Sequence, residues 1–152
     1  MSIKFNFKLI NLIILFISIL TTEVTYLDED NFEREITSSN DIWLIEIYSE
    51  KCESCRSFES HWEQLIKKLD YLNIGRINID ESKGMNLANK INALENGIPA
   101  VRLVFSKDDM KDVMTGTEEP LPGAHTLKKR INKILEEKGK LKNSKKADNE
   151  EL

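Results

Sequence analysis

The stretch "IWLIEIYSEKCESC", residues 42–55, decides how the rest of the sequence is interpreted. Its first seven residues form an apolar run that predicts a β-strand buried on both faces, as in the centre of a covered sheet. Beyond it, apolar side chains recur at the spacing of one face of a long helix. These positions are Phe58, Trp62, Leu65, Ile66 and Leu69. The only two cysteines of the chain, Cys52 and Cys55, therefore lie where a central strand turns into a helix.

This position favours redox chemistry over a structural or metal-binding role for the cysteines. The amino end of a helix carries about half a positive charge, which stabilises a thiolate at Cys52. In such motifs the cysteine pKa falls to about 3.5–7.5. Cys55, about one turn later, can then attack a mixed disulfide held on Cys52.

The alternatives for the pair are weaker. A disulfide that closes so short a loop constrains the unfolded chain little, so it makes a poor structural staple. A zinc site needs two further ligands. His61 and His125 are the only histidines and form no second close pair, so the sequence predicts no metal site and no cofactor.

The remaining hydrophobic patterns predict an α/β fold. Helical spacing and strand-like alternation follow one another along the whole chain. The predicted helices are residues 31–37, a helix from Cys55, residues 82–91 and a helix from near Thr126; the predicted strands are residues 42–48, 74–80, the part of 96–105 after Pro99, and 113–115. Strands that alternate with helices imply a mixed central sheet with helices on both faces.

Length and charge limit the classes of function. The chain has 152 residues, of which 40% are apolar and 32% charged, enough for one domain with one core. The net charge is −4 at pH 7. A nucleic-acid-binding protein usually shows a basic face, so no nucleic acid is expected among the partners.

The two ends of the chain predict a secretory address. Lys4 and Lys8 precede an apolar run of twelve residues at 9–20, the layout of a cleaved signal peptide over residues 1–22. The alternative, a membrane anchor, needs about 20 apolar residues, so no membrane association is expected after cleavage. The domain is then predicted at residues 23–138, followed by a charged and disordered tail at 139–152.

The last four residues, "NEEL", are similar to the KDEL-type retrieval signal, although Asn and Glu replace its first two residues. This ending favours the lumen of the endoplasmic reticulum as the location, with secretion as the alternative.

Three segments carry a family resemblance. They are "VTYLDEDNFEREITSSNDIWLIEIYSEKCESC" at residues 24–55, "RSFESHWEQL" at 56–65 and "NGIPAVRLVF" at 96–105. Together they resemble a thioredoxin-fold domain of the protein disulfide isomerase family, over about residues 24–138. The resemblance implies a thioredoxin fold and a thiol–disulfide oxidoreductase that acts on protein thiols or disulfides without a cofactor.

The resemblance also implies roles for single residues. Cys52 is the expected nucleophile and Cys55 the resolving cysteine. Glu46 matches the buried acid that carries a proton to and from the second cysteine; a carboxylate within an apolar strand is costly unless it is paired or protonated. Pro99 is expected to follow a cis peptide bond and to lie beside Cys52, with the backbone of Ile98 presented to a substrate peptide as an added strand.

Departures from the family pattern predict a detuned thiolate. Lys51 stands where the family has Trp, and Glu53-Ser54 replaces the Gly-His of isomerases. The charge of Glu53 should make Cys52 less acidic, Lys51 should offset part of this effect, and Ser54 can donate a hydrogen bond. We also find no match for the arginine that tunes the second cysteine in isomerases, because Arg102 lies within a strand. We therefore expect a more reducing or weaker catalyst than the isomerases.

Two other functions stay open at this stage. The chain could be a thioredoxin-like binding or chaperone module that docks onto a larger secretory-pathway complex with little redox turnover. It could also be a small structural domain with a vestigial disulfide. Function has to be argued from the site and not from the fold.

Overall fold

A computed structural model of the chain describes residues 23–38 and 41–140. It contains a five-stranded sheet and four helices in these residues. The elements in chain order are β1 (Val24–Tyr26), α2 (Phe32–Ser38), β2 (Trp43–Tyr48), α3 (Glu53–Ile66), β3 (Asn73–Asn78), α4 (Ser82–Lys90), β4 (Ala100–Ser106), β5 (Asp109–Met114) and α5 (Ala124–Glu137). The predicted signal peptide, the ending "NEEL" and nearly all of the predicted tail lie outside the described residues.

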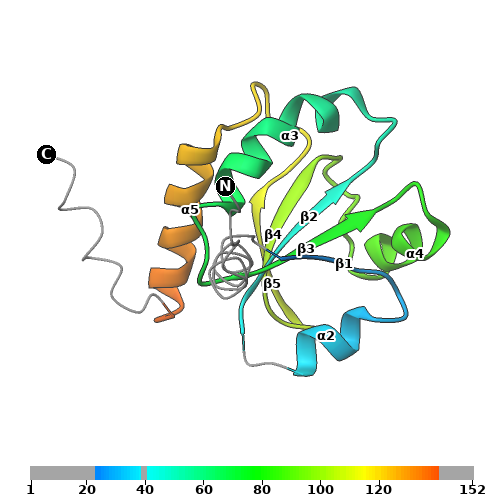
Figure 1. Cartoon of the computed structure of the whole chain (residues 1–152), viewed down its shortest axis with the longest axis horizontal. Helices are drawn as coiled ribbons and strands as arrows, with labels where there is room; N and C mark the ends of the chain where they lie inside the picture. Colours follow the sequence, from blue (N-terminus) through cyan, green and yellow to red (C-terminus); the bar gives the residue numbers. More distant parts are fainter. Residues whose placement is uncertain (1–22, 39–40, 141–152) are drawn as a thin grey trace, which may run out of the picture.

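The sheet is mixed and has the strand order β1-β3-β2-β4-β5. The strands β1, β3 and β2 run parallel, whereas β4 is antiparallel to β2 and β5 is antiparallel to β4. Helices α3 and α5 pack together on one face, and α2 and α4 cover the other (Figure 1). This arrangement confirms the predicted thioredoxin fold with helices on both faces.

Strand β2 lies in the middle of the sheet, and all six of its residues are buried. Successive side chains of a strand point to opposite faces. Trp43, Ile45 and Ile47 belong to the core cluster on the α2 and α4 side, and Leu44 belongs to the cluster beneath α3 and α5. The same alternation directs Glu46 toward α3, which is how a carboxylate enters the core.

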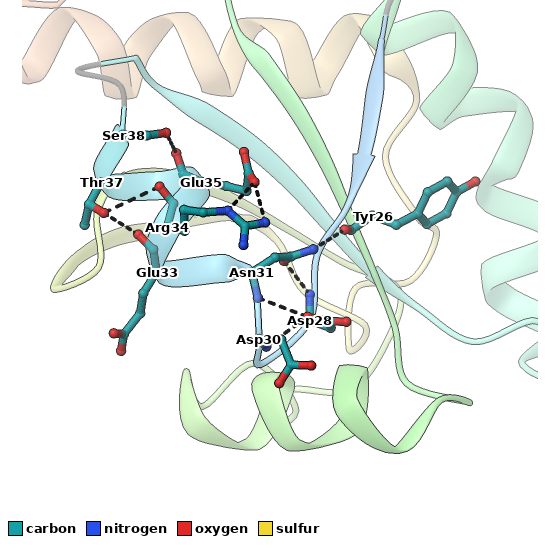
Figure 2. A network of polar contacts seen from close by, with 9 residues as sticks. All are labelled: Tyr26, Asp28, Asp30, Asn31, Glu33, Arg34, Glu35, Thr37 and Ser38. Carbon is teal, nitrogen blue, oxygen red and sulfur yellow. Dashed lines mark hydrogen bonds and ion pairs between the residues drawn. The ribbon is translucent and has the colours of Figure 1, made fainter.

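The turn between β1 and α2 is held by reciprocal side-chain caps (Figure 2). The Asp28 carboxylate accepts hydrogen bonds from the backbone N–H groups of Asp30 (2.9 Å) and Asn31 (3.1 Å). The Asn31 side chain accepts from the Asp28 N–H (3.0 Å) and donates to the Tyr26 carbonyl (2.9 Å). Such reciprocal bonds satisfy the free N–H groups at the start of a helix and place α2 against the sheet.

The structure adds one strand to the sequence prediction and corrects the first residue of three other elements. Strand β1 was not predicted, because three residues are too few to show a period. Strand β5 begins at Asp109 and not at Val113, since the polar side chains of an edge strand hide the alternation. Helix α5 begins at Ala124, with Gly123 as its N-cap, so Thr126 lies inside the first turn. Helix α3 begins at Glu53 and not at Cys55.

Gly84 has a packing role in α4. A Cβ atom at this position would lie 2.0 Å from the Asn78 carbonyl oxygen at the end of β3. Only glycine allows α4 to approach the sheet so closely.

In the part of the chain that the structure describes, no helix has the length and apolar character needed to cross a membrane.

Candidate active site

Cys52 is the N-cap residue of α3, with an extended backbone (φ −82°, ψ 123°). Its sulfur accepts a hydrogen bond from the backbone N–H of Cys55 at 3.2 Å. The free N–H groups and the positive end of the helix dipole therefore point at this sulfur. The local sequence produces this geometry because the central strand ends at Tyr48, and the loop of residues 49–52 leads directly into the helix.

The surroundings of Cys52 favour its thiolate. Partial burial alone would raise its pKa, but hydrogen bonds with Cys55 and Ser54 outweigh burial and lower the pKa below its ordinary value. The Ser54 hydroxyl lies 3.0 Å from the Cys52 sulfur and 3.4 Å from the Ile98 carbonyl oxygen. Cys52 is also partly exposed. An exposed cysteine of lowered pKa is the kind that reacts.

Cys55 has the opposite properties. Only 3% of the residue is exposed, and burial, followed by a hydrogen bond with Cys52 and the charges of Cys52 and Glu46, raises its pKa to about 12. At neutral pH the Cys55 thiol thus stays protonated until a base removes the proton. Both cysteines are free in this structure. The pair therefore joins one accessible, acidic thiol to one buried, protonated thiol.

The loop before β4 lies against the cysteines. The Ile98–Pro99 peptide bond is cis, as expected, and the Ile98 carbonyl oxygen lies 4.0 Å from the Cys52 sulfur. Gly116 closes the other side of this loop, because a Cβ atom there would lie 2.3 Å from the Ile98 nitrogen. The structure thus brings Ile98 to Cys52, while binding of a substrate by Ile98 and Pro99 stays a prediction.

Glu46 is fully buried in the sheet face beneath α3. Its Oε2 atom lies 2.7 Å from Nε of Arg76, without the alignment of a hydrogen bond. Burial raises the pKa of Glu46 to about 7, although the positive charge of Arg76 opposes the increase. A carboxyl group that titrates near neutral pH can both accept and donate a proton, and its charge also acts on Cys55.

Arg76 contacts the buried acid, and the sequence alone did not single it out. It lies on β3 directly opposite Glu46 in the parallel register. Its guanidinium group contacts Glu46 and Glu59 and stacks over the Tyr48 ring, 4.0 Å from the ring centroid. An arginine within the apolar alternation of "IGRINID" was a usable signal. Arg102, by contrast, donates to the carbonyl oxygens of Ile91 and Asn92.

Asp80 fixes the loop before the cysteines. Its carboxylate accepts hydrogen bonds from the Ser49 hydroxyl (2.9 Å) and the Glu50 N–H (2.8 Å), and lies 3.6 Å from Nζ of Lys51. Lys51 is thus directed at Asp80, and Glu53 is exposed at the start of α3. That Lys51, Glu53 and Ser54 together tune the thiolate stays a prediction.

Within residues 23–38 and 41–140, no three His, Cys, Asp or Glu side chains gather as a metal site would require.

The fold and the site together define a class of protein. The chain has a thioredoxin fold with a C-x-x-C pair at the amino end of the helix that follows the central strand. A buried acid on that strand and a cis-proline loop before the neighbouring strand β4 complete the site. A thioredoxin family model matches residues 23–132. The chain belongs to the thioredoxin family.

Several relatives of the chain are proteins named protein disulfide isomerases. A putative protein disulfide-isomerase of Dictyostelium discoideum is 28% identical over 131 residues, which cover 78% of this chain and 31% of that protein. Human protein disulfide-isomerase A6 is 23% identical over 90 residues, covering 57% of this chain and 20% of that protein. The chain thus spans about a third or less of these relatives, and it matches them through a single thioredoxin-like domain.

Solved structures confirm the fold. The J-Trx1 fragment of ERdj5 has a TM-score of 0.58 at 18% identity, covering 74% of this chain and 52% of that one. Thioredoxin f2 of Chlamydomonas reinhardtii has a TM-score of 0.56 at 16% identity, covering 79% of this chain and all of that one. The family model and the isomerase relatives support a thiol–disulfide oxidoreductase function at the level of the family.

Proposed function

We propose that this chain is an active thiol–disulfide oxidoreductase whose substrates are protein thiols and disulfides. The single observation that carries the proposal is the contrast between the two cysteines. Cys52 is partly exposed and has a lowered pKa, whereas Cys55 is buried and has a raised pKa. This contrast supports attack by Cys52 and resolution by Cys55.

In the proposed reaction, the Cys52 thiolate attacks one sulfur of a substrate disulfide. A mixed disulfide forms and the first substrate sulfur leaves as a thiolate. The Glu46 carboxylate then takes the proton of Cys55, and the Cys55 thiolate attacks the Cys52 sulfur. The second substrate sulfur leaves, so the substrate gains two electrons and the cysteine pair becomes a disulfide. The reverse sequence oxidises a substrate dithiol.

We place the protein in the lumen of the endoplasmic reticulum. The apolar run at residues 9–20 and the ending "NEEL" support this location, as do relatives named protein disulfide isomerases. Secretion is the alternative location, and docking onto a larger secretory-pathway complex is the alternative function.

Trapping with Cys55→Ala tests the proposal against simple docking. Without the resolving thiol, the mixed disulfide on Cys52 should persist, so client proteins should stay covalently attached until a reductant is added. Non-reducing gel electrophoresis followed by mass spectrometry of the cross-linked peptides reads this result. The Cys52→Ala, Cys55→Ala double variant is the control. Partners captured equally by both variants, and released without a reductant, would instead favour a docking module.

A further inference from the structure

Glu59 connects the buried acid to the protein surface. It lies on α3, one turn after Cys55, and its two carboxylate oxygens accept hydrogen bonds from Nη1 (3.0 Å) and Nη2 (2.7 Å) of Arg76. A bidentate pair of this kind fixes the plane of the guanidinium group. The Glu59 side chain is 42% exposed, whereas that of Arg76 is 12% exposed and that of Glu46 is fully buried.

One positive charge is therefore shared by two carboxylates. Nε of Arg76 faces Glu46, while both terminal nitrogens face Glu59. Each terminal nitrogen donates a hydrogen bond to Glu59, and neither oxygen of Glu46 has an aligned hydrogen-bond donor among the described residues. A buried carboxylate without such donors is poorly stabilised. The orientation of Arg76 toward Glu59 thus limits how strongly Arg76 stabilises the negative charge of Glu46.

The charges around Glu46 come from three elements. Arg76 faces it from β3, Glu59 and Cys55 act on it from α3, and Tyr48 lies two residues along β2. On the fourth side, the neighbour of Glu46 on β4 is the apolar Val101. Among these groups, Glu59 is the carboxylate that reaches solvent.

Glu59 also shares a cavity with the resolving cysteine. A hollow of about 230 Å³ is lined by Tyr48, Ser49, Glu50, Cys55, Arg56 and Glu59. It has room for water molecules, which need about 30 Å³ each in the liquid. Glu59 and Cys55 therefore border the same hollow.

We propose that Glu59 is a positioning residue: it holds Arg76 through the bidentate pair and shares its charge, and so keeps Glu46 able to take up and release a proton. The exchange of that proton with Cys55 rests on the proposed function. The control that Glu59 exerts over Glu46 does not, because it is a property of the resting protein. Consistent with this role, the negative charge of Glu59 contributes to the raised pKa of Glu46.

The test is Glu59→Gln, which keeps the size of the side chain and removes its charge. Among the residues that the structure describes, Glu46 is then the only carboxylate left to pair with Arg76, so the Glu46 anion is better stabilised. We expect the midpoint of the Glu46 titration, followed by the ¹³C shift of its carboxyl carbon in the reduced protein, to fall by about half a pH unit or more. Glu59→Asp keeps the charge and should restore most of the wild-type midpoint.

Glu63→Gln is the matched control, because Glu63 is an exposed glutamate one turn further along α3. A Glu46 midpoint that falls in Glu59→Gln but not in Glu63→Gln supports the proposal. Equal midpoints in the two variants overturn it. The reduction of a disulfide substrate, measured on the same proteins, separates the two claims: a wild-type protein without Cys52-dependent turnover contradicts the proposed function, while the titration still decides the role of Glu59.

Discussion

Replacing Cys52 with alanine is expected to remove essentially all disulfide reduction. The variant loses the accessible thiolate, and Cys55 does not replace it, because burial raises its pKa to about 12 and leaves it protonated. Cys52 and Cys55 act together, so removing one of them removes the activity of the pair. We expect the rate of disulfide reduction to fall by about a hundredfold or more. The measurement is the reduction of a disulfide-bonded protein in the presence of a small thiol reductant.

Ser57→Ala is a matched control for this prediction. Ser57 lies on the same helix, and its exposed hydroxyl donates to the Glu53 carbonyl oxygen at 3.1 Å. This variant should keep the wild-type rate. If Cys52→Ala and wild type reduced the substrate equally fast, the assignment of Cys52 as nucleophile would be wrong.

The second large effect is expected in the stability of Glu46→Gln. The folded protein raises the pKa of Glu46 from 4.5 to about 7. Between these two pH values the folded state therefore holds more protons at this site than the unfolded state does. The wild-type protein then loses stability as the pH rises through this window, by about 3 kcal/mol in total. Glutamine does not titrate, so the variant should not show this loss.

We compare the free energy of unfolding of Glu46→Gln with that of wild type. As the pH rises from 4 to 8, we expect the difference to shift by about 3 kcal/mol in favour of the variant. Urea unfolding at a series of pH values measures this difference. Glu63 is an exposed glutamate on α3. The free energy of unfolding of Glu63→Gln should therefore depend on pH in the same way as that of wild type. A constant difference between Glu46→Gln and wild type at all pH values would show that Glu46 does not carry a raised pKa.

The centre of the fold was predictable because its pattern is strong and local. Within about 25 residues, the sequence holds the apolar run of β2, the cysteine pair and the helical spacing of α3. Each of these patterns supports the interpretation of the other two. The burial of Glu46 was predictable from the same apolar run. A carboxylate inside such a strand is costly unless it is paired or protonated, which marked Glu46 as a candidate site residue. The cis bond before Pro99 came from the family resemblance, because base rates favour a trans bond.

The environment of the site depends on contacts between distant residues, and those were not predicted. Arg76 meets Glu46 only because β3 pairs with β2 in one particular register, and it meets Glu59 only because α3 crosses that position. Asp80 reaches the loop before the cysteines across 31 residues. A single sequence carries no record of register or of helix placement, so these partners became visible only in three dimensions.

The most direct test of the account is a redox titration of the pair in glutathione buffers, with the modified thiols counted by mass spectrometry. We predict one two-electron transition between a Cys52–Cys55 disulfide and the dithiol. Because no histidine lies between the cysteines to stabilise the thiolate, its potential should lie below the roughly −180 mV of protein disulfide isomerase. Cysteines that stay reduced throughout, or that form only separate adducts with glutathione, would contradict the claim that they are a redox pair.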